Sequence, residues 1–470
     1  MHEVDEIIHN EKSMIIAPAG YGKTHFITSC VSAASSKQLI LTHTHSGVAS
    51  LRQKLKKACI ESKFYNVETI TSFAQKYVFA YSDQKQLPSQ EDSKKYYPYI
   101  IEKATEIFSF SHIKSVLQAT YSMLYVDEYQ DCSEDQHQLI LSLAEVMNVC
   151  ILGDPLQGIF DFSTKNPIDL TDKNFFSGFW ENRYELSTPW RWVINDSDEL
   201  GYNLHQIRQK ISETNSIDLR LFNSINLTIS KDPYRNNYSE IMKIISDNEN
   251  LLVIIPDSKQ INKRLDFQKR FLNRLVLLEA IDGKDFYALA KKCDQIIASG
   301  TFPMLLDLMK IVCNKTAVDI WFNNSGVKNK RDPADNAIIQ PVNEKLMSFL
   351  SSKNPKDLAL FLHLITKLPK IKCYRKDLLF SLIDSIEITQ ISKETVYKAM
   401  MEKRNFIRRV GRDVNNKCIG TTLLTKGLEF ESVLIINCNE FTCRRNFYVA
   451  ATRASKRLYI ITNNPILTFF

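Results

Sequence analysis

The sequence predicts an α/β protein built from two sheet-bearing lobes with helical insertions. Short apolar segments that are typical of buried parallel strands alternate with segments of helical periodicity. Several of these apolar segments run directly into polar, acidic or glycine-containing turns, which is where α/β sheets place their ligand contacts. The pattern occupies both ends of the 470-residue chain, and a mainly helical stretch separates them.

The composition agrees with a globular protein of roughly two to four packing units. Hydrophobic residues make up 44% of the chain and charged residues 24%, and the net charge of +7 permits a nucleic-acid partner without requiring one. The ten cysteines stand singly, without a C-x-x-C pair, so neither a zinc site nor a disulfide framework is expected. No apolar run approaches the ~20 residues of a membrane span. The acidic start, Met-His-Glu-Val-Asp-Glu, lacks the basic residues of a secretory signal, so we expect a cytoplasmic protein without a membrane partner.

The first chemical motif is a glycine-containing turn between a strand and a helix. Residues 14–16 are apolar, and the turn after them ends in Lys-Thr at the expected start of a helix. Such a turn is typical of a P-loop, whose backbone N–H groups hold phosphates while the lysine reaches the β- and γ-phosphates and the hydroxyl binds Mg²⁺. The generic pattern has Gly where Ala17 stands. The residues expected to contact nucleotide are Ala17, Pro18, Ala19, Gly20, Tyr21, Gly22, Lys23, Thr24 and His25.

Two further strands are predicted before the first insertion. Residues 38–41 lead into a hydroxyl-rich loop, which either contacts a ligand or caps the next helix, with Ser46 as the cap. Residues 66–71 tend toward another strand, followed by Ser-Phe. From about residue 77 to 121 helical periodicity dominates, and we interpret this stretch as a helical insertion in the sheet domain.

An acidic turn supplies the second part of a nucleotide site. Residues 123–126 form an apolar strand that delivers Asp127 and Glu128 at its carboxyl end. We expect Asp127 to hold Mg²⁺ opposite Thr24 and Glu128 to polarise the attacking water. The alternative is an acidic surface turn, and the upstream P-loop argues against it.

The next strand, residues 149–152, leads into a turn that contains Gln157. An amide in this position can sense a γ-phosphate or orient water. Farther along, Phe162 either stacks on a base or packs into the core.

Taken in order, these segments resemble the motifs of superfamily 1A DNA helicases, the UvrD/Rep/PcrA group. Residues 127–131 resemble motif II, residues 153–157 resemble motif III, and residues 17–24 resemble motif I, in which Ala at the first position is usual. The resemblance implies two RecA-like P-loop lobes that bind ATP and Mg²⁺ between them. Residues 42–45 and 69–73 resemble motifs Ia and Ib of the single-strand track. The DNA contacts implied are Thr44, His45, Ser72, Phe73 and Phe162.

The segment Leu-Ser-Thr-Pro-Trp-Arg, residues 186–191, is similar to motif IV. This similarity implies that Trp190 stacks on adenine, where the family has Tyr, and that Arg191 contacts the γ-phosphate. The substitution is mild, because Trp and Tyr both offer an aromatic face to the base. Trp192 lies beside them, so which ring stacks stays open; without the resemblance the three residues would be interpreted as a packing cluster.

The second lobe is predicted from a buried strand at residues 251–256 and from the return of the pattern at residues 420–430. There Lys-Gly-Leu-Glu-Phe matches motif V, which implies that Glu429 approaches the ribose. Leu423 and Leu424 stand where the family often has His-Ser. Residues 447–454 resemble motif VI, which implies that Arg453 is an arginine finger reaching the γ-phosphate from the second lobe. The expected catalytic residues are Lys23, Asp127, Glu128, Gln157, Arg191 and Arg453.

By this alignment residues 1–200 form the first RecA-like lobe (1A), with the helical insertion at about 77–121 (1B). Residues 201–265 and 411–470 form the second lobe (2A). Residues 266–410 form a reduced, mainly helical insertion in the position of subdomain 2B, without a chemical motif.

Base recognition departs from the family pattern. The family has an adenine-reading Gln before the P-loop, whereas here no Gln precedes Gln38. Asp5 or Glu6 is left to accept a hydrogen bond from the adenine amino group, and broad use of nucleoside triphosphates is the alternative.

The resemblance implies an ATP-dependent 3′→5′ DNA helicase or translocase that acts on single-stranded or tailed duplex DNA in repair or anti-phage defence. Among short members the chain is similar to the helicase-like subunit of Gabija anti-phage systems, which suggests a partner nuclease. The alternative is a regulatory ATPase subunit that senses DNA and nucleotide for a nuclease complex, with little or no strand separation.

Overall fold

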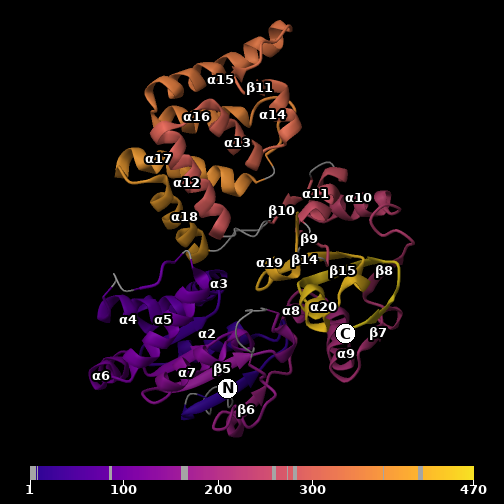
Figure 1. Ribbon diagram of the computed structural model, residues 1–470. Helices are drawn as coiled ribbons and strands as arrows, with labels where there is room; N and C mark the ends of the chain where they lie inside the picture. Colours follow the sequence, from indigo (N-terminus) through magenta and orange to yellow (C-terminus); the bar gives the residue numbers. More distant parts are fainter. Residues whose placement is uncertain are drawn as a thin grey trace. The chain divides into compact units, whose positions relative to one another are not determined.

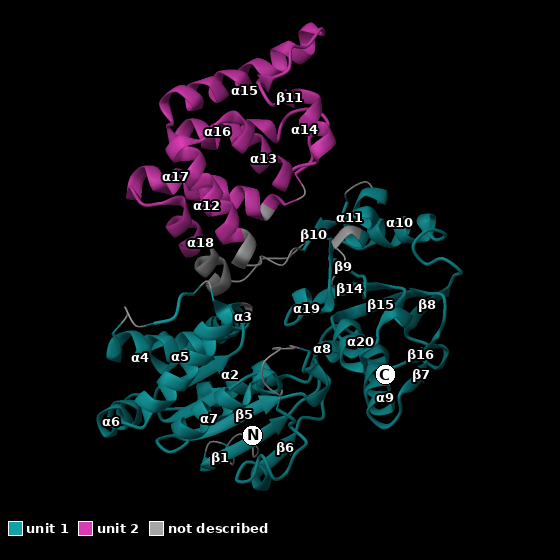
Figure 2. Ribbon diagram, in the orientation of Figure 1, with its two compact units in different colours: residues 1–278, 409–470 teal, residues 279–408 magenta. Residues whose placement is uncertain are grey.

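The computed structural model describes residues 7, 9–83, 87–90, 92–159, 168–256, 261–271, 274–278, 283–373, 375–410 and 417–469. The chain divides into two units, residues 1–278 with 409–470 and residues 279–408 (Figure 2). The first unit contains two six-stranded parallel sheets, and the second is almost entirely helical (Figure 1). The predicted α/β class with two RecA-like lobes is confirmed.

The first sheet is parallel throughout. Its strands, in spatial order, are β3 (Tyr65–Thr69), β2 (Gln38–Thr42), β4 (Met123–Val126), β5 (Asn148–Gly153), β1 (Lys12–Ile16) and β6 (Arg183–Glu185). Every residue of β2 and β4 is buried. This burial explains why these strands are near-continuous apolar runs, since a parallel sheet is covered on both faces.

Helices cover both faces of this sheet. The helices of the lobe are α2 (Lys23–Ala33), α3 (His45–Lys57), α4 (Ile70–Tyr81), α5 (Ser93–Phe108), α6 (Ser111–Thr120) and α7 (Glu134–Leu143). Ile15, Ile40 and Tyr125 pack in one hydrophobic cluster with α2 and α3, whereas the adjacent Leu39 and Leu124 pack in another with α4, α5 and α7. Successive side chains of a strand point to opposite faces, so one apolar strand serves two cores. Helices α5 and α6 occupy much of the stretch predicted as a helical insertion.

The second sheet repeats this architecture. Its strands, in spatial order, are β10 (Val276–Leu277), β13 (Cys418–Gly420), β9 (Leu251–Ile254), β14 (Phe430–Ile436), β15 (Ala454–Thr462) and β8 (Ile225–Ile229), all parallel. Its helices are α8 (Trp190–Val193), α9 (Asp198–Glu213), α10 (Tyr238–Asp247), α11 (Ile261–Arg270), α19 (Thr422–Thr425) and α20 (Arg444–Ala451). A short antiparallel pair, β7 (Ser216–Asp218) and β16 (Ile466–Thr468), lies outside the sheet.

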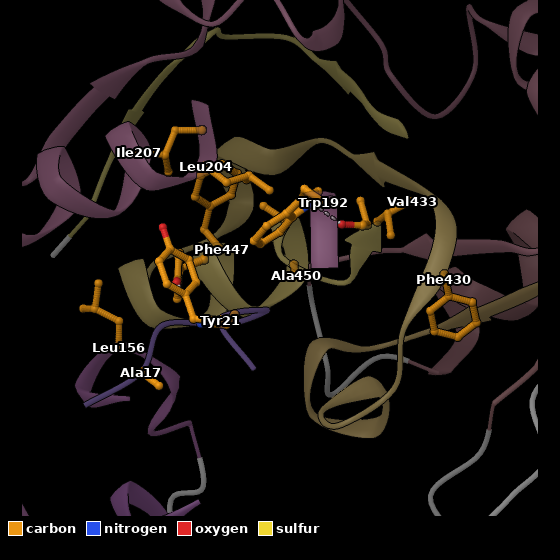
Figure 3. Packing of buried hydrophobic residues seen from close by; sticks show 14 of the residues in the cluster. Ala17, Tyr21, Leu156, Trp192, Leu204, Ile207, Phe430, Val433, Phe447 and Ala450 are labelled. Carbon is orange, nitrogen blue, oxygen red and sulfur yellow. Dashed lines mark hydrogen bonds between the residues drawn. The ribbon is translucent and has the colours of Figure 1, made fainter. Parts of the chain in front are cut away.

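One hydrophobic cluster contains residues of both sheets. Tyr21 and Leu156 from the first lobe belong to the same cluster as Trp192, Val433 and Phe447 (Figure 3). Trp192 is 1% exposed, and its Nε1–H donates to the carbonyl oxygen of Ala454 at 2.9 Å. The two lobes therefore share a continuous core inside the first unit.

The second unit has a core of its own, which includes Leu305, Phe349, Phe361 and Leu382. Its helices are α12 (Gly283–Ser299), α13 (Phe302–Val312), α14 (Lys315–Trp321), α15 (Pro333–Ser352), α16 (Pro355–Ile365), α17 (Lys376–Ser392) and α18 (Val396–Val410), with a small hairpin of β11 (Phe322–Asn323) and β12 (Gly326–Val327). Among the helices that the structure describes in either unit, none is long and apolar enough to cross a bilayer.

Candidate nucleotide site and nucleic-acid edge

The carboxyl edge of the first sheet carries five of the predicted motifs. Because the strands are parallel, the turns after β1 to β5 all emerge at this edge. The spatial order makes β4, β5 and β1 neighbours, so the acidic turn, the turn of Gln157 and the P-loop lie together. The turns after β2 and β3, which carry the predicted DNA contacts, lie on the other side of β4.

The P-loop needs its two glycines for both conformation and space. Gly20 has φ +77° and Gly22 has φ +86°, a region that side chains with a Cβ rarely adopt. A Cβ on Gly20 would lie 2.8 Å from the Trp192 ring, and one on Gly22 would lie 3.0 Å from the Trp190 ring. Gly22 is the N-cap of α2, and no side chain caps the helix there, which suits the first N–H groups of α2 to a phosphate.

Lys23 lies folded over this loop. It is 8% exposed, and its Nζ donates to the carbonyl oxygen of Ala17 at 3.1 Å. Ala17, Pro18, Ala19 and Tyr21 are buried in the loop, Thr24 is half-buried, and His25 is exposed. A cationic amine bonded to a neutral carbonyl can exchange that partner for a phosphate oxygen, which is a stronger acceptor.

The acidic turn after β4 holds two carboxylates of different character. Asp127 is 6% exposed, and its Oδ1 accepts from the backbone N–H of Glu128 at 2.9 Å. Burial and the charge of Glu128 raise the pKa of Asp127 to about 6. Burial would also raise the pKa of Glu128, but Lys23 and Lys426 outweigh it and hold that pKa at about 2. Glu128 also has φ +57°, an uncommon conformation for a residue other than glycine and one that concentrates at functional sites.

Gln130 connects this turn to the next one. Its Nε2 donates to Glu128 Oε2, and its Oε1 accepts from the backbone N–H of Asp154 at 3.0 Å. The turn after β5 is a single 3₁₀ turn, η4 (Pro155–Gln157), in which Gln157 is 3% exposed. The amide of Gln157 is thus fixed beside the acidic turn.

Two arginines that lie outside the first sheet, Arg453 and Arg191, contact residues near the P-loop and the turn of Gln157. Arg453, directly before β15, donates from Nη2 to Gln157 Oε1 at 3.3 Å and from Nη1 to the Leu428 carbonyl at 3.0 Å. Burial and the neighbouring Arg191 lower the pKa of Arg453 to about 10, so it stays cationic at neutral pH. Arg191 donates from Nε to Glu429 Oε2 at 2.8 Å, and its backbone N–H donates to the Gly20 carbonyl at 2.9 Å. Both guanidinium groups are therefore close to the P-loop and its neighbours.

The two adjacent tryptophans have different environments. Trp190 is 49% exposed and packs beside Gly22, whereas Trp192 is 1% exposed in the core shared by both lobes. Only an exposed ring next to the P-loop has a face to offer a base, so the geometry favours Trp190 for stacking.

Two charged residues of the predicted motifs form a contact that the sequence did not predict. Lys426, in the segment similar to motif V, donates from Nζ to Asp131 Oδ2 of the acidic turn and to the Gln157 carbonyl oxygen at 2.6 Å. The side chains are 6% and 1% exposed, so this ion pair between the lobes is buried. Burial raises the pKa of Asp131 to about 7, although Lys426 opposes the shift. The sequence offered one signal of this ion pair, which was the presence of opposite charges in two separate motifs.

Lys54 of α3 is a second residue that sequence reasoning missed. Desolvation of its amine lowers the pKa, and the charges that act on it are those of Glu429, Arg191, Asp127 and Lys23. Lys54 is exposed at the surface of α3, so only the charges of these groups, and no direct contact, make it a candidate for contact with a nucleotide phosphate. Its place in a basic helix, with three lysines in the last turn, gave no sign of this.

Three of the predicted DNA contacts lie at the starts of helices α3 and α4. Thr44 is the N-cap of α3 and accepts from the Gly47 N–H at 3.0 Å, and His45 is half-buried in the first turn. The cap is therefore Thr44 and not Ser46, because the helix begins at His45. Ser72 is half-buried in the first turn of α4, whose N-cap is Thr69.

Phe73 does not fit the prediction of a DNA contact. It is 1% exposed and packs against Tyr77, Phe108 and Tyr121, so the ring fills the core beneath α4. The apolar face of α4 explains this burial. Phe162, Asp5 and Glu6 lie outside the described residues.

The donor set suits a nucleotide with Mg²⁺. Among the described residues no group of three or more His, Cys, Asp or Glu could hold a metal. Mg²⁺ in phosphoryl-transfer sites is bound by one or two protein oxygens together with phosphate oxygens and water, so Asp127 and Thr24 meet its requirement. The glycine-lined loop and buried Lys23 have the groups that complementary phosphate contacts require.

Comparisons with known proteins agree with this geometry. Residues 2–163 match the family model described as an AAA domain. The chain is also similar to Gabija protein GajB of Bacillus cereus (strain VD045), with 23% identity over 361 residues. That match spans 73% of this chain and 64% of the relative, which is less than two thirds of the relative's length. The two matches confirm the predicted resemblance to UvrD/Rep-like superfamily 1 helicases, with the Gabija subunit among them.

Proposed function

We propose that this protein is a DNA-dependent ATPase that uses ATP and Mg²⁺ to move 3′→5′ along DNA. The observation that carries the proposal is the contact of Arg453 with Gln157, because it joins a second-lobe cation to the turn beside the P-loop. A site divided between two lobes couples the nucleotide state to their contact. The resemblance supplies the direction of movement.

Hydrolysis needs positioning and charge stabilisation more than covalent chemistry. Lys23 and the first turn of α2 hold the phosphates, and Thr24 and Asp127 hold Mg²⁺, which neutralises charge on the transferred group. Glu128, ionised at neutral pH, orients and polarises the attacking water. Arg191 and Arg453 stabilise the charge that develops on the γ-phosphate. Trp190 stacks on the base, and Glu429 approaches the ribose once it leaves Arg191.

The DNA track follows the turns after β2 and β3. Thr44, His45 and Ser72 stand at the starts of α3 and α4, where helix N–H groups favour a phosphate backbone. We propose these residues as contacts to one strand, with Phe162 as a stacking aromatic. Each cycle of nucleotide binding and hydrolysis then shifts the second lobe relative to this strand.

The likeness to Gabija protein GajB supports a role in anti-phage defence together with a partner nuclease subunit. A second candidate function is a regulatory ATPase subunit that senses DNA and nucleotide without separating strands. Leu423 favours it, since this residue is 46% exposed where the family often has a polar DNA contact.

Purified protein with MgATP tests the proposal. We expect hydrolysis to rise on addition of single-stranded DNA, and Lys23→Ala or Glu128→Gln to abolish it. Lys57→Ala, which removes an exposed lysine of α3, is the matched control. Absence of hydrolysis in the wild type, with and without DNA, would rule out the proposed function.

Strand displacement separates the two candidates. A duplex with a 3′ single-stranded tail is expected to be unwound, and one with a 5′ tail is expected to persist. DNA-stimulated hydrolysis without displacement of either duplex favours the regulatory subunit.

A further inference from the structure

A buried ion pair lies behind Gln157, and the proposed reaction gives it no role. Asp154, directly after β5, is fully buried. Its Oδ1 accepts from Nη1 of Arg208 at 2.5 Å and from the backbone N–H of Leu156 at 3.1 Å. Its Oδ2 accepts from Nε2 of Gln157 at 2.9 Å. Arg208 belongs to α9, and its side chain is 15% exposed.

This pair determines which way the Gln157 amide points. A carboxylate oxygen is only an acceptor, so it selects the NH₂ end of the amide. The Oε1 end is then turned toward Arg453, whose Nη2 donates to it at 3.3 Å. With the amide reversed, its NH₂ group would meet a guanidinium donor. The carboxylate of Asp154 thus excludes one of the two orientations that fit the same space.

Arg208 is itself held between the lobes. Its Nη1 also donates to the hydroxyl oxygen of Tyr448 at 3.3 Å, and that oxygen accepts from the backbone N–H of Ala19 in the P-loop at 3.3 Å. The guanidinium lies 5.5 Å from the centre of the Tyr448 ring. A buried carboxylate is costly without a partner, and the guanidinium of Arg208 supplies the opposite charge beside Asp154.

We propose that Arg208 and Asp154 are positioning residues that orient the Gln157 amide, with Oε1 directed toward Arg453 and the water that attacks the nucleotide. The inference rests on the proposed ATP hydrolysis. An oriented Oε1 accepts a hydrogen bond from that water once Arg453 turns to the phosphate, whereas an NH₂ group does not. Asp154 contacts Gln157 directly and Arg208 contacts Asp154, so both act through Gln157.

Asp154→Asn is the most direct test because it keeps size and shape. The Asn oxygen satisfies Arg208 and Leu156, so its NH₂ faces Gln157 and selects the reversed amide. We expect kcat for ATP to fall about 10²-fold, the loss typical of a misplaced reacting group, while KM changes less than about threefold. Arg208→Ala is expected to act in the same direction, and Arg208→Lys, which keeps the charge, is expected to restore part of kcat.

A double-mutant cycle distinguishes positioning from a general structural role. In a Gln157→Ala background, Asp154→Asn is expected to cause no further fall in kcat, because the group through which it acts is gone. Arg220→Ala is the matched control, since it removes an arginine from an exposed ion pair with Asp218 in the same unit. Its kcat is expected to equal that of the wild type.

Additive losses in kcat for Asp154→Asn and Gln157→Ala would overturn the inference while leaving the proposed function intact. A parallel rise in KM, with kcat unchanged, would do the same. A wild-type protein that hydrolyses no nucleoside triphosphate would overturn the proposed function first and the inference with it.

Discussion

The two halves of one sheet edge use polar side chains in different ways. Beside β1, β4 and β5, charged and amide groups such as Asp131 and Gln157 contact residues of the second lobe. Beside β2 and β3, Thr44 and Thr69 cap the helices that follow them and bond within three residues. Substitutions in the first half should therefore alter the relation between lobes, and those in the second half should act locally.

The largest effect is expected for Arg453→Ala. Loss of an arginine finger lowers hydrolysis by about 10³–10⁵-fold, while nucleotide binding, measured with a fluorescent ATP analogue, persists because Lys23 and the P-loop are intact. Arg274→Ala, on the exposed surface of the same unit, serves as the control. Wild-type-like turnover in Arg453→Ala would contradict a site shared by two lobes.

Removal of the buried ion pair comes next. Lys426→Ala leaves Asp131 buried without its cation, which costs about 3–5 kcal/mol of stability. Urea unfolding of the first unit measures the loss. The double variant Lys426→Met with Asp131→Leu removes both charges and is expected to recover most of it, whereas a double variant as unstable as Lys426→Ala would show that packing, not charge, is responsible.

A smaller effect concerns pH. Burial and the charge of Lys426 lower the pKa of His43 to about 3, and Nε2 of this residue contacts Cys132 Sγ at 3.2 Å. The folded protein favours the neutral imidazole, so its stability contribution is present above pH 6.5 and is lost as pH falls toward 3. His43→Gln is expected to flatten that part of the stability profile, and the exposed His112→Gln is expected to leave it unchanged.

The smallest effect is expected at the helix cap. Thr44→Ala removes an acceptor for the Gly47 N–H and costs about 1 kcal/mol. Thr44→Ser retains the hydroxyl and should be near wild type. If Thr44→Ala weakens binding of single-stranded DNA while Ser at this position does not, the hydroxyl also contacts the strand.

The motifs were predictable because their chemistry is local. A strand that ends in Gly-Tyr-Gly-Lys-Thr or in Asp-Glu can be recognised within ten residues, and parallel pairing then brings such turns to one edge. The two-lobe α/β fold followed from the same short segments. The roles of Lys23 and Glu128 remain predictions that Lys23→Ala and Glu128→Gln test, and the role of Asp127 also remains a prediction.

Long-range packing decided the features that the sequence did not reveal. Trp190 and Trp192 are chemically alike, and only the core shared by the lobes makes one exposed and the other buried. The contact of Arg208 with Asp154 spans 54 residues, and no periodicity in α9 distinguishes this arginine from a surface charge. Phe73 was misjudged because its motif suggested a ligand while its helix face required a core residue.

The place at which the helical unit is inserted has a topological consequence. Residues 279–408 follow β10 and precede β13 in the sequence. These two strands are parallel neighbours in the second sheet. A tight turn cannot join parallel neighbours; they need a crossover of a dozen or more residues. The entire helical unit therefore serves as the crossover connection of β10 and β13. A shortened protein would require a replacement crossover, since closing the gap with a few residues would force β10 out of the sheet.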